Sequence, residues 1–133
     1  MTIRVDFDDF APASSGVPRA ELVLFGPATP GQLAATFSQA LVDTGAVHSQ
    51  LPEEVAMQLG LNPSADGIQV VISTAAGPSQ RWLLRVDLAF EGIFVSSVPV
   101  YFSQGAVDLV GRSTLYAASP TTGFEPAQWL RKF

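Results

Sequence analysis

The feature that most constrains the fold of this 133-residue chain is a run of strictly alternating residues near its middle. Over residues 82–90 a large apolar side chain occupies every second position, and the intervening positions include Arg85 and Asp87. Successive side chains of a strand point to opposite faces, so this pattern predicts a β-strand with one buried face. A second apolar run at 68–73 precedes it across the small, glycine-containing segment 74–80. The two runs are predicted to form a β-hairpin with a mobile tip.

Composition extends the pattern to the rest of the chain. Ten prolines and 11 glycines punctuate short apolar runs, and 47% of the residues are hydrophobic while 14% are charged. These values are typical of a well-buried globule built from many strands and turns. The length predicts one domain spanning residues 1–133. Further strands are predicted at 21–25, 33–42 and 93–102, a weaker one at 3–7, and turns or loops at 11–18 and 62–67.

Helical periodicity is confined to short segments. A helix is predicted at 52–59, because Pro52 suits its first turn and Gly60 suits its end. A turn of helix is also predicted to start at 113–115. The C-terminal segment 127–133 is too apolar for a free tail, so we expect it to dock on this domain or on a partner.

Charge and residue content exclude several kinds of function. The formal net charge is −5 with scattered basic residues, which argues against a nucleic-acid partner. There is no cysteine, and a single histidine cannot build a histidine-rich metal site, so we expect no metal and no other cofactor. The N-terminus has no signal-peptide pattern, and no run reaches the roughly 20 apolar residues of a membrane span. We therefore expect a soluble, cytoplasmic protein with no membrane partner.

One carboxylate, Asp43, follows an apolar run directly and is the strongest chemical signal in the chain. A buried carboxylate is costly unless it is hydrogen-bonded, and the next residues can supply such bonds. Thr44 brings a hydroxyl group, and Gly45 permits a tight backbone whose N–H groups point at the acid. One interpretation is an Asx-type turn that merely closes a strand. The other is a catalytic carboxylate held by its own loop.

Two nearby residues have both a structural and a functional interpretation. His48 could contact substrate, but we expect a surface or capping residue, as is usual for a lone histidine beside a helix start. Trp82 could flank a binding site, but its alternating position favours the core. A Ser-His-Asp triad is not credible in a chain with one histidine and no nucleophile-elbow spacing.

Three features in a fixed order resemble the retropepsin family, the single-domain aspartic proteases of retroviruses and their cellular and bacterial relatives. They are the loop 43–46 (Asp-Thr-Gly-Ala) with its downstream helix, the glycine-tipped hairpin, and the run 109–112 (Leu-Val-Gly-Arg). The resemblance covers roughly residues 20–116 and rests on the pair of motifs at this separation. It implies an all-β fold, a closed barrel of the acid-protease type with a flap hairpin and one or two short helices.

The resemblance also implies roles for single residues. Asp43 resembles the catalytic aspartate, Thr44 the residue whose hydroxyl braces two active-site loops, and Gly45 the contact to the substrate backbone. Residues 73–80 resemble the flap that closes over substrate. The expected site residues are Asp43 (catalytic); Thr44, Gly45 and Ala46 (loop); Thr74, Ala75, Ala76 and Gly77 (flap); and Leu109, Val110, Gly111 and Arg112 (support).

The chain departs from the retroviral pattern at one position. Retroviral members usually carry an acid four residues after the catalytic aspartate, where it pairs with the arginine of the Gly-Arg motif. Here that position is Val47, so Arg112 needs another partner, which favours a non-viral branch. Segment 26–38 also has no assigned role.

Aspartic-protease chemistry needs two carboxylates that share one proton. This chain has one Asp-Thr-Gly, and Asp87 and Asp108 lack that setting. The resemblance therefore implies a homodimeric aspartic endopeptidase in which Asp43 from each of two copies acts on a peptide or protein substrate. Two alternatives are a catalytically silent retropepsin-fold module that binds peptides or mediates dimerisation, and an unrelated β-barrel.

Overall fold

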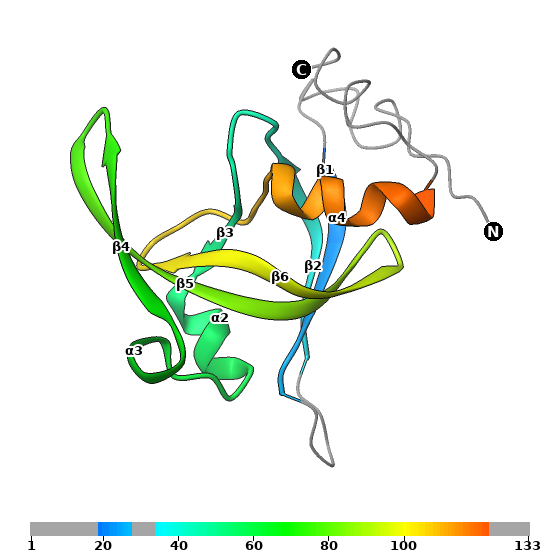
Figure 1. The fold of residues 1–133 in the computed structure, drawn as a ribbon, viewed down its shortest axis with the longest axis horizontal. Helices are drawn as coiled ribbons and strands as arrows, with labels where there is room; N and C mark the ends of the chain where they lie inside the picture. The colour runs from blue at the N-terminus through cyan, green and yellow to red at the C-terminus, as the bar shows by residue number, and fades with distance from the viewer. Residues whose placement is uncertain (1–18, 28–33, 123–133) are drawn as a thin grey trace.

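The computed structural model of the protein describes residues 19–27 and 34–122 (Figure 1). Within them the chain forms mainly strands, with three short helices between or after them. The elements are β1 (Arg19–Phe25), β2 (Ala34–Val42), β3 (Ser49–Pro52), α2 (Glu53–Gln58), α3 (Pro63–Asp66), β4 (Ile68–Thr74), β5 (Gly77–Phe90), β6 (Ile93–Ser103), β7 (Leu109–Val110) and α4 (Arg112–Thr122). The expected all-β fold with short helices is confirmed.

The strands of the described residues form one mixed sheet in the order β1-β2-β7-β3-β6-β5-β4. Strand β1 pairs with β2 on one side and with β5 on the other, so the sheet closes on itself as a barrel. Strand β4 pairs only with β5 within this part of the chain and extends the hairpin away from the barrel, at the left of Figure 1. The two-residue strand β7 is inserted between β2, to which it is parallel, and β3, to which it is antiparallel.

The core follows the alternation that the sequence predicts. In β5 the side chains of Leu84, Val86, Leu88 and Phe90 are at most 4% exposed. Trp82 is half-buried and packs against this cluster, which agrees with its structural interpretation. Each fully buried Leu or Phe side chain stabilises the fold by about 1.5–3 kcal/mol. The alternation therefore fixes which face of β5 lies inside and which face is free for a site.

The hairpin is present, but its tip is shorter than predicted. The β4–β5 ladder continues to the pair Thr74 and Gly77, so only Ala75 and Ala76 form the turn. Gly77 has a φ of +110°, which L-residues with a side chain rarely adopt. The prediction of a loop over 74–80 was wrong, because residues 77–80 keep pairing with β4 and belong to β5.

The helices differ from the predictions mainly in extent. The helix predicted at 52–59 is α2, with Leu59 at its C-terminal boundary. The turn predicted at 62–67 contains the short helix α3, because the Asn62 side chain accepts a hydrogen bond from the Ser64 N–H group (3.1 Å). The helical turn predicted at 113–115 extends through α4, whose Leu115 and Ala118 are buried. None of these helices is long and apolar enough to span a membrane.

Three predictions lie outside the described residues. They concern the weak strand signal at 3–7, the loop at 11–18 and the docking of the C-terminal segment 127–133. Part of segment 26–38 lies there as well, and its remainder, from Ala34, belongs to β2.

Candidate active site

Asp43 is fixed at the end of β2 by strand β7. The Asp43 N–H group donates to the Val110 carbonyl (2.9 Å), and the Leu41 N–H group donates to the Asp108 carbonyl (3.0 Å). Leu41 and Leu109 are direct partners in this parallel pair. The predicted support by Leu109 and Val110 is therefore a backbone ladder that holds Asp43 where β2 leaves the barrel.

The loop after Asp43 folds back onto its carboxylate. The Gly45 N–H group donates to Asp43 Oδ1 (2.8 Å), and the Ala46 N–H group donates to the Asp43 carbonyl (3.2 Å). A Cβ atom on Gly45 would lie 3.0 Å from Oδ1, so a side chain there would crowd the acid. The Asx-type turn is thus present. It uses one carboxylate oxygen, and Oδ2 accepts no hydrogen bond from the described residues, so this turn and a chemical role are compatible.

The far side of the loop is tied to the start of α4. The Arg112 N–H group donates to the Ala46 carbonyl (2.9 Å), and the Ser113 N–H group donates to the Val47 carbonyl (2.9 Å). Arg112 therefore supports the loop through its backbone. Its side chain forms no ion pair within the described part of the chain, and Val47, at the position of the retroviral acid, is 54% exposed.

Gly111 is the tightest point of this arrangement. A Cβ atom there would lie 2.4 Å from the His48 carbonyl carbon and 2.9 Å from the Ser49 nitrogen. The Gly111 N–H group donates to Ser49 Oγ (3.0 Å), and Ser49 Oγ lies 2.6 Å from Thr114 Oγ1. Ser49 and Thr114 are completely buried. Sequence reasoning missed this pair, because nothing in the sequence distinguishes it from other scattered hydroxyl residues.

A continuous row of cross-strand partners defines the face of the sheet on which Asp43 lies. Leu41 pairs with Leu109, Leu109 with Gln50, Gln50 with Tyr101, and Tyr101 with Leu83. Directly opposed residues share a face of a sheet. Asp43 follows Leu41 by two residues, so its side chain lies on this same face, opposite the barrel core.

This face forms a pocket of about 440 Å³ beside Asp43. Its walls come from the active-site loop, from strands β3, β6 and β7, and from the hairpin. The lining residues are Asp43, Gly45, Ala46, Val47, His48, Gln50, Ile72, Arg81, Tyr101 and Leu109. The expected loop residues Asp43, Gly45 and Ala46 are thus brought together, while Thr44 is buried beneath them at 7% exposure.

His48 is part-exposed and lies in the wall of this pocket. Its Nδ1 atom lies 3.0 Å from Ser113 Oγ, and its ring meets the Tyr101 ring edge-on at 5.1 Å between centroids. Burial lowers the pKa of His48, and the positive charge of Arg85 lowers it further. The neutral imidazole is therefore favoured. Sequence reasoning missed this position because the pairing of β3 with β6, which brings His48 to Tyr101, is non-local.

Comparison with known proteins agrees with this geometry. The family model described as Aspartyl protease matches residues 30–114, well over half of the chain. The chain belongs to the retropepsin-like aspartyl protease family. The matched range contains the Asp43 loop, the hairpin and the Leu109–Gly111 support. A search of curated proteins finds no match.

In this family member the expected flap residues do not line the pocket. Ala75 and Ala76 are exposed at the tip, whereas the hairpin reaches the pocket through Ile72 of β4 and Arg81 of β5. Neither Ile72 nor Arg81 was singled out from the sequence, because the register that turns both toward Asp43 is set by the sheet.

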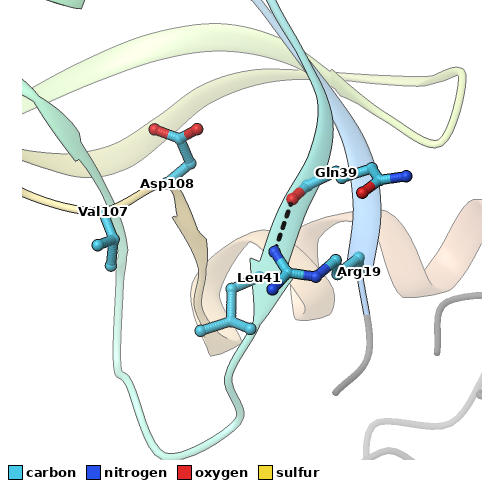
Figure 2. A pocket seen from close by; sticks show the side chains of 5 residues that line it. All are labelled: Arg19, Gln39, Leu41, Val107 and Asp108. Atoms are coloured by element: carbon cyan, nitrogen blue, oxygen red, sulfur yellow. Dashed lines mark hydrogen bonds between the residues drawn. The ribbon is translucent and has the colours of Figure 1, made fainter. Parts of the chain in front are cut away.

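A second hollow of about 340 Å³ lies beside Leu41 of β2 in this aspartyl protease domain (Figure 2). It is lined by Arg19, Gln39, Leu41, Val107 and Asp108, and the Arg19 guanidinium donates to the Gln39 carbonyl (3.2 Å). Burial raises the pKa of Asp108. This hollow and the pocket beside Asp43 share no lining residue.

Ranges 19–27 and 34–122 contain no group of three or more His, Cys, Asp or Glu side chains arranged to hold a metal ion.

Proposed function

We propose that this protein is an aspartic endopeptidase whose dyad consists of Asp43 from each of two copies of the chain. The observation that carries the proposal is the setting of Asp43. The β2–β7 backbone ladder fixes it, and backbone hydrogen bonds from Arg112 and Ser113 hold the loop that follows it. Gly45 holds one carboxylate oxygen, and the other oxygen accepts no hydrogen bond from the described residues and lies beside a pocket. The family match supports the same chemistry.

A second copy is required because each chain carries one Asp-Thr-Gly loop. The surface next to Asp43 supports such an encounter, since Gly45 is exposed and Val47 is 54% exposed. Two carboxylates brought together across a two-fold axis hold one proton between them, because like charges at that distance are not both ionised. Association of the two chains would therefore create the catalytic group itself.

The proposed reaction follows from that shared proton. The ionised carboxylate takes a proton from a water molecule, and the oxygen of that water forms a bond to the peptide carbonyl carbon. The protonated carboxyl donates its proton to the carbonyl oxygen. The resulting tetrahedral diol collapses as a proton passes to the amide nitrogen and the C–N bond breaks. The β4–β5 hairpin, whose Ile72 lies in the pocket wall, would act as a flap that covers the substrate.

The decisive experiment compares the wild type with Asp43→Asn on a randomised peptide library at mildly acidic and neutral pH. We expect cleavage by the wild type and a loss of at least about 10³-fold in the variant, since both carboxylates of the dyad are replaced by amides that cannot ionise. Glu54→Gln on α2 is the matched control, because it removes an exposed carboxylate away from the pocket and should retain activity.

Protein concentration provides a second test. Specific activity should fall when the chain is diluted below its dimer dissociation constant, and sedimentation should show the loss of the dimer over the same range. Cleavage that survives in Asp43→Asn would refute the mechanism. A dimer that binds peptides and never cleaves them would favour the silent module.

A further inference from the structure

The pocket beside Asp43 contains the cationic side chain of Arg81. Arg81 belongs to β5, and its Nε–H group is buried without a hydrogen-bond partner among the residues that the structure describes. Its guanidinium forms no ion pair with any residue of ranges 19–27 and 34–122. The guanidinium carbon lies over the Tyr101 ring, 5.8 Å from the ring centroid.

The stacking on Tyr101 leaves this arrangement incomplete. Cation–π contact attracts the positive charge but does not satisfy the Nε–H donor, which still has no partner in the described part of the chain. A buried donor without a partner is costly, and a carboxylate satisfies a guanidinium best because it accepts two parallel hydrogen bonds. The other polar side chains that line the pocket accept no hydrogen bond from the Arg81 Nε–H group; they are Asp43, His48, Gln50 and Tyr101.

The position of Arg81 places it within reach of a peptide bound at Asp43. Arg81 precedes Leu83 by two residues, and Leu83 continues the cross-strand row that runs from Leu41 to Tyr101. Arg81 therefore lies on the same face of the sheet as Asp43. Strands β7, β3 and β6 lie between β2 and β5, so an anion held by Arg81 need not meet the negative charge of Asp43.

We propose that this pocket selects a glutamate or aspartate side chain of the substrate, whose carboxylate binds the Arg81 guanidinium. This inference rests on the proposed function, since it names the substrate class for the same site. Arg81 sets specificity, and Tyr101 positions its guanidinium by stacking. Peptides that carry an acid near the cleaved bond are then preferred over their amide counterparts.

Binding tests this proposal without requiring cleavage. The probes are hexapeptides whose central bond is a non-cleavable CH₂–NH group, each with one glutamate scanned through the flanking positions, and matched peptides with glutamine instead. Calorimetric titration of the full chain should show that glutamate binds about tenfold more tightly than glutamine at one position, as expected for a charge-assisted hydrogen bond. The preference should vanish in Arg81→Met and persist in weaker form in Arg81→Lys.

Arg85→Met is the matched control. Arg85 lies four residues further along the same strand, is exposed, and donates to the Ser97 carbonyl (2.9 Å), outside this pocket. This variant should keep the glutamate preference. Equal affinity for every glutamate and glutamine pair, or a preference that survives Arg81→Met, would overturn the proposal.

The outcomes for the two proposals can be separated. Binding of glutamate peptides through Arg81 by a chain that never cleaves would support the selectivity and refute the catalysis. Cleavage that depends on Asp43 but shows no Arg81-dependent preference would support the catalysis and refute the selectivity. A changed dimer dissociation constant in Arg81→Met, with the glutamate preference unchanged, would show that Arg81 serves the contact between copies instead.

Discussion

The replacement Gly111→Ala probes the junction that holds the Asp43 loop in place. Its Cβ atom would lie 2.4 Å from the His48 carbonyl carbon and 2.5 Å from the carbonyl oxygen. Carbon atoms in ordinary contact lie about 3.5–4.0 Å apart, so one backbone segment must move by about 1 Å or more. Both neighbours are backbone atoms, and no flexible side chain can relieve the contact by changing its rotamer.

The expected cost has two parts. Overpacking of this kind costs about 1–3 kcal/mol. Movement of residues 111–113 also weakens their hydrogen bonds to Ser49, Ala46 and Val47, each with a net value of about 0.5–1.5 kcal/mol. We expect the free energy of unfolding to fall by about 3–5 kcal/mol, a large part of the about 5–15 kcal/mol that is typical of a domain.

Urea unfolding followed by far-ultraviolet circular dichroism measures this difference at one fixed protein concentration, since dimerisation would make stability concentration-dependent. Gly105→Ala is the control. Gly105 has a φ of +71° and open space around its Cβ position, so it should lose only about 1–2 kcal/mol from backbone strain. The reasoning fails if Gly111→Ala is no more destabilising than Gly105→Ala.

Three further perturbations test neighbouring parts of the site. Ser49→Ala leaves the Gly111 N–H group and the Thr114 hydroxyl without their shared partner, so urea unfolding should show a loss of about 1–3 kcal/mol; a variant as stable as the wild type would contradict the network. Burial and the charge of Arg85 lower the pKa of His48, so as the pH falls below 6.5 the unfolded chain binds a proton at His48 more readily than the folded chain does, and the free energy of unfolding should decrease. The free energy of unfolding of His48→Gln, measured across pH 5–8, should lack this decrease. Burial raises the pKa of Asp108 above 3.8, so the folded chain is destabilised as the pH rises through the folded-state pKa and this carboxyl group ionises. Asp108→Asn should therefore have a higher free energy of unfolding than the wild type at pH 7, and the difference should shrink toward pH 3.8.

The arrangement of β7 explains why a two-residue strand matters so much. Its backbone bonds to β2 on one side and pairs with β3 on the other, and Gly111 at its end permits the close crossing under His48. The loop after Asp43 is held on its other side by two backbone N–H groups at the start of α4, which donate to the carbonyls of Ala46 and Val47. Asp43 is thus held by segments about 65 residues away in sequence, as the contacts between Ser49 and Thr114 illustrate.

The sequence by itself determined the elements that depend on local patterns. Alternation over 82–90 defined the buried face of β5, and Pro52 and Gly60 bounded α2 closely. The Asp43 turn was also readable, because a carboxylate followed by threonine and glycine can be satisfied by its own loop. These features depend on side-chain period and on hydrogen bonds that span two or three residues, and both are visible in a single sequence.

Only the tertiary structure decided what surrounds Asp43. The insertion of β7 between β2 and β3, and the closure of the barrel by β1 and β5, set the registers that bring Gln50, Tyr101 and Arg81 onto the face of Asp43. The same packing buried Ser49 against Thr114 and turned His48 into the pocket. These positions depend on the pairing of strands that are distant in sequence. A shift of one residue in the register would move each side chain to the other face of the sheet.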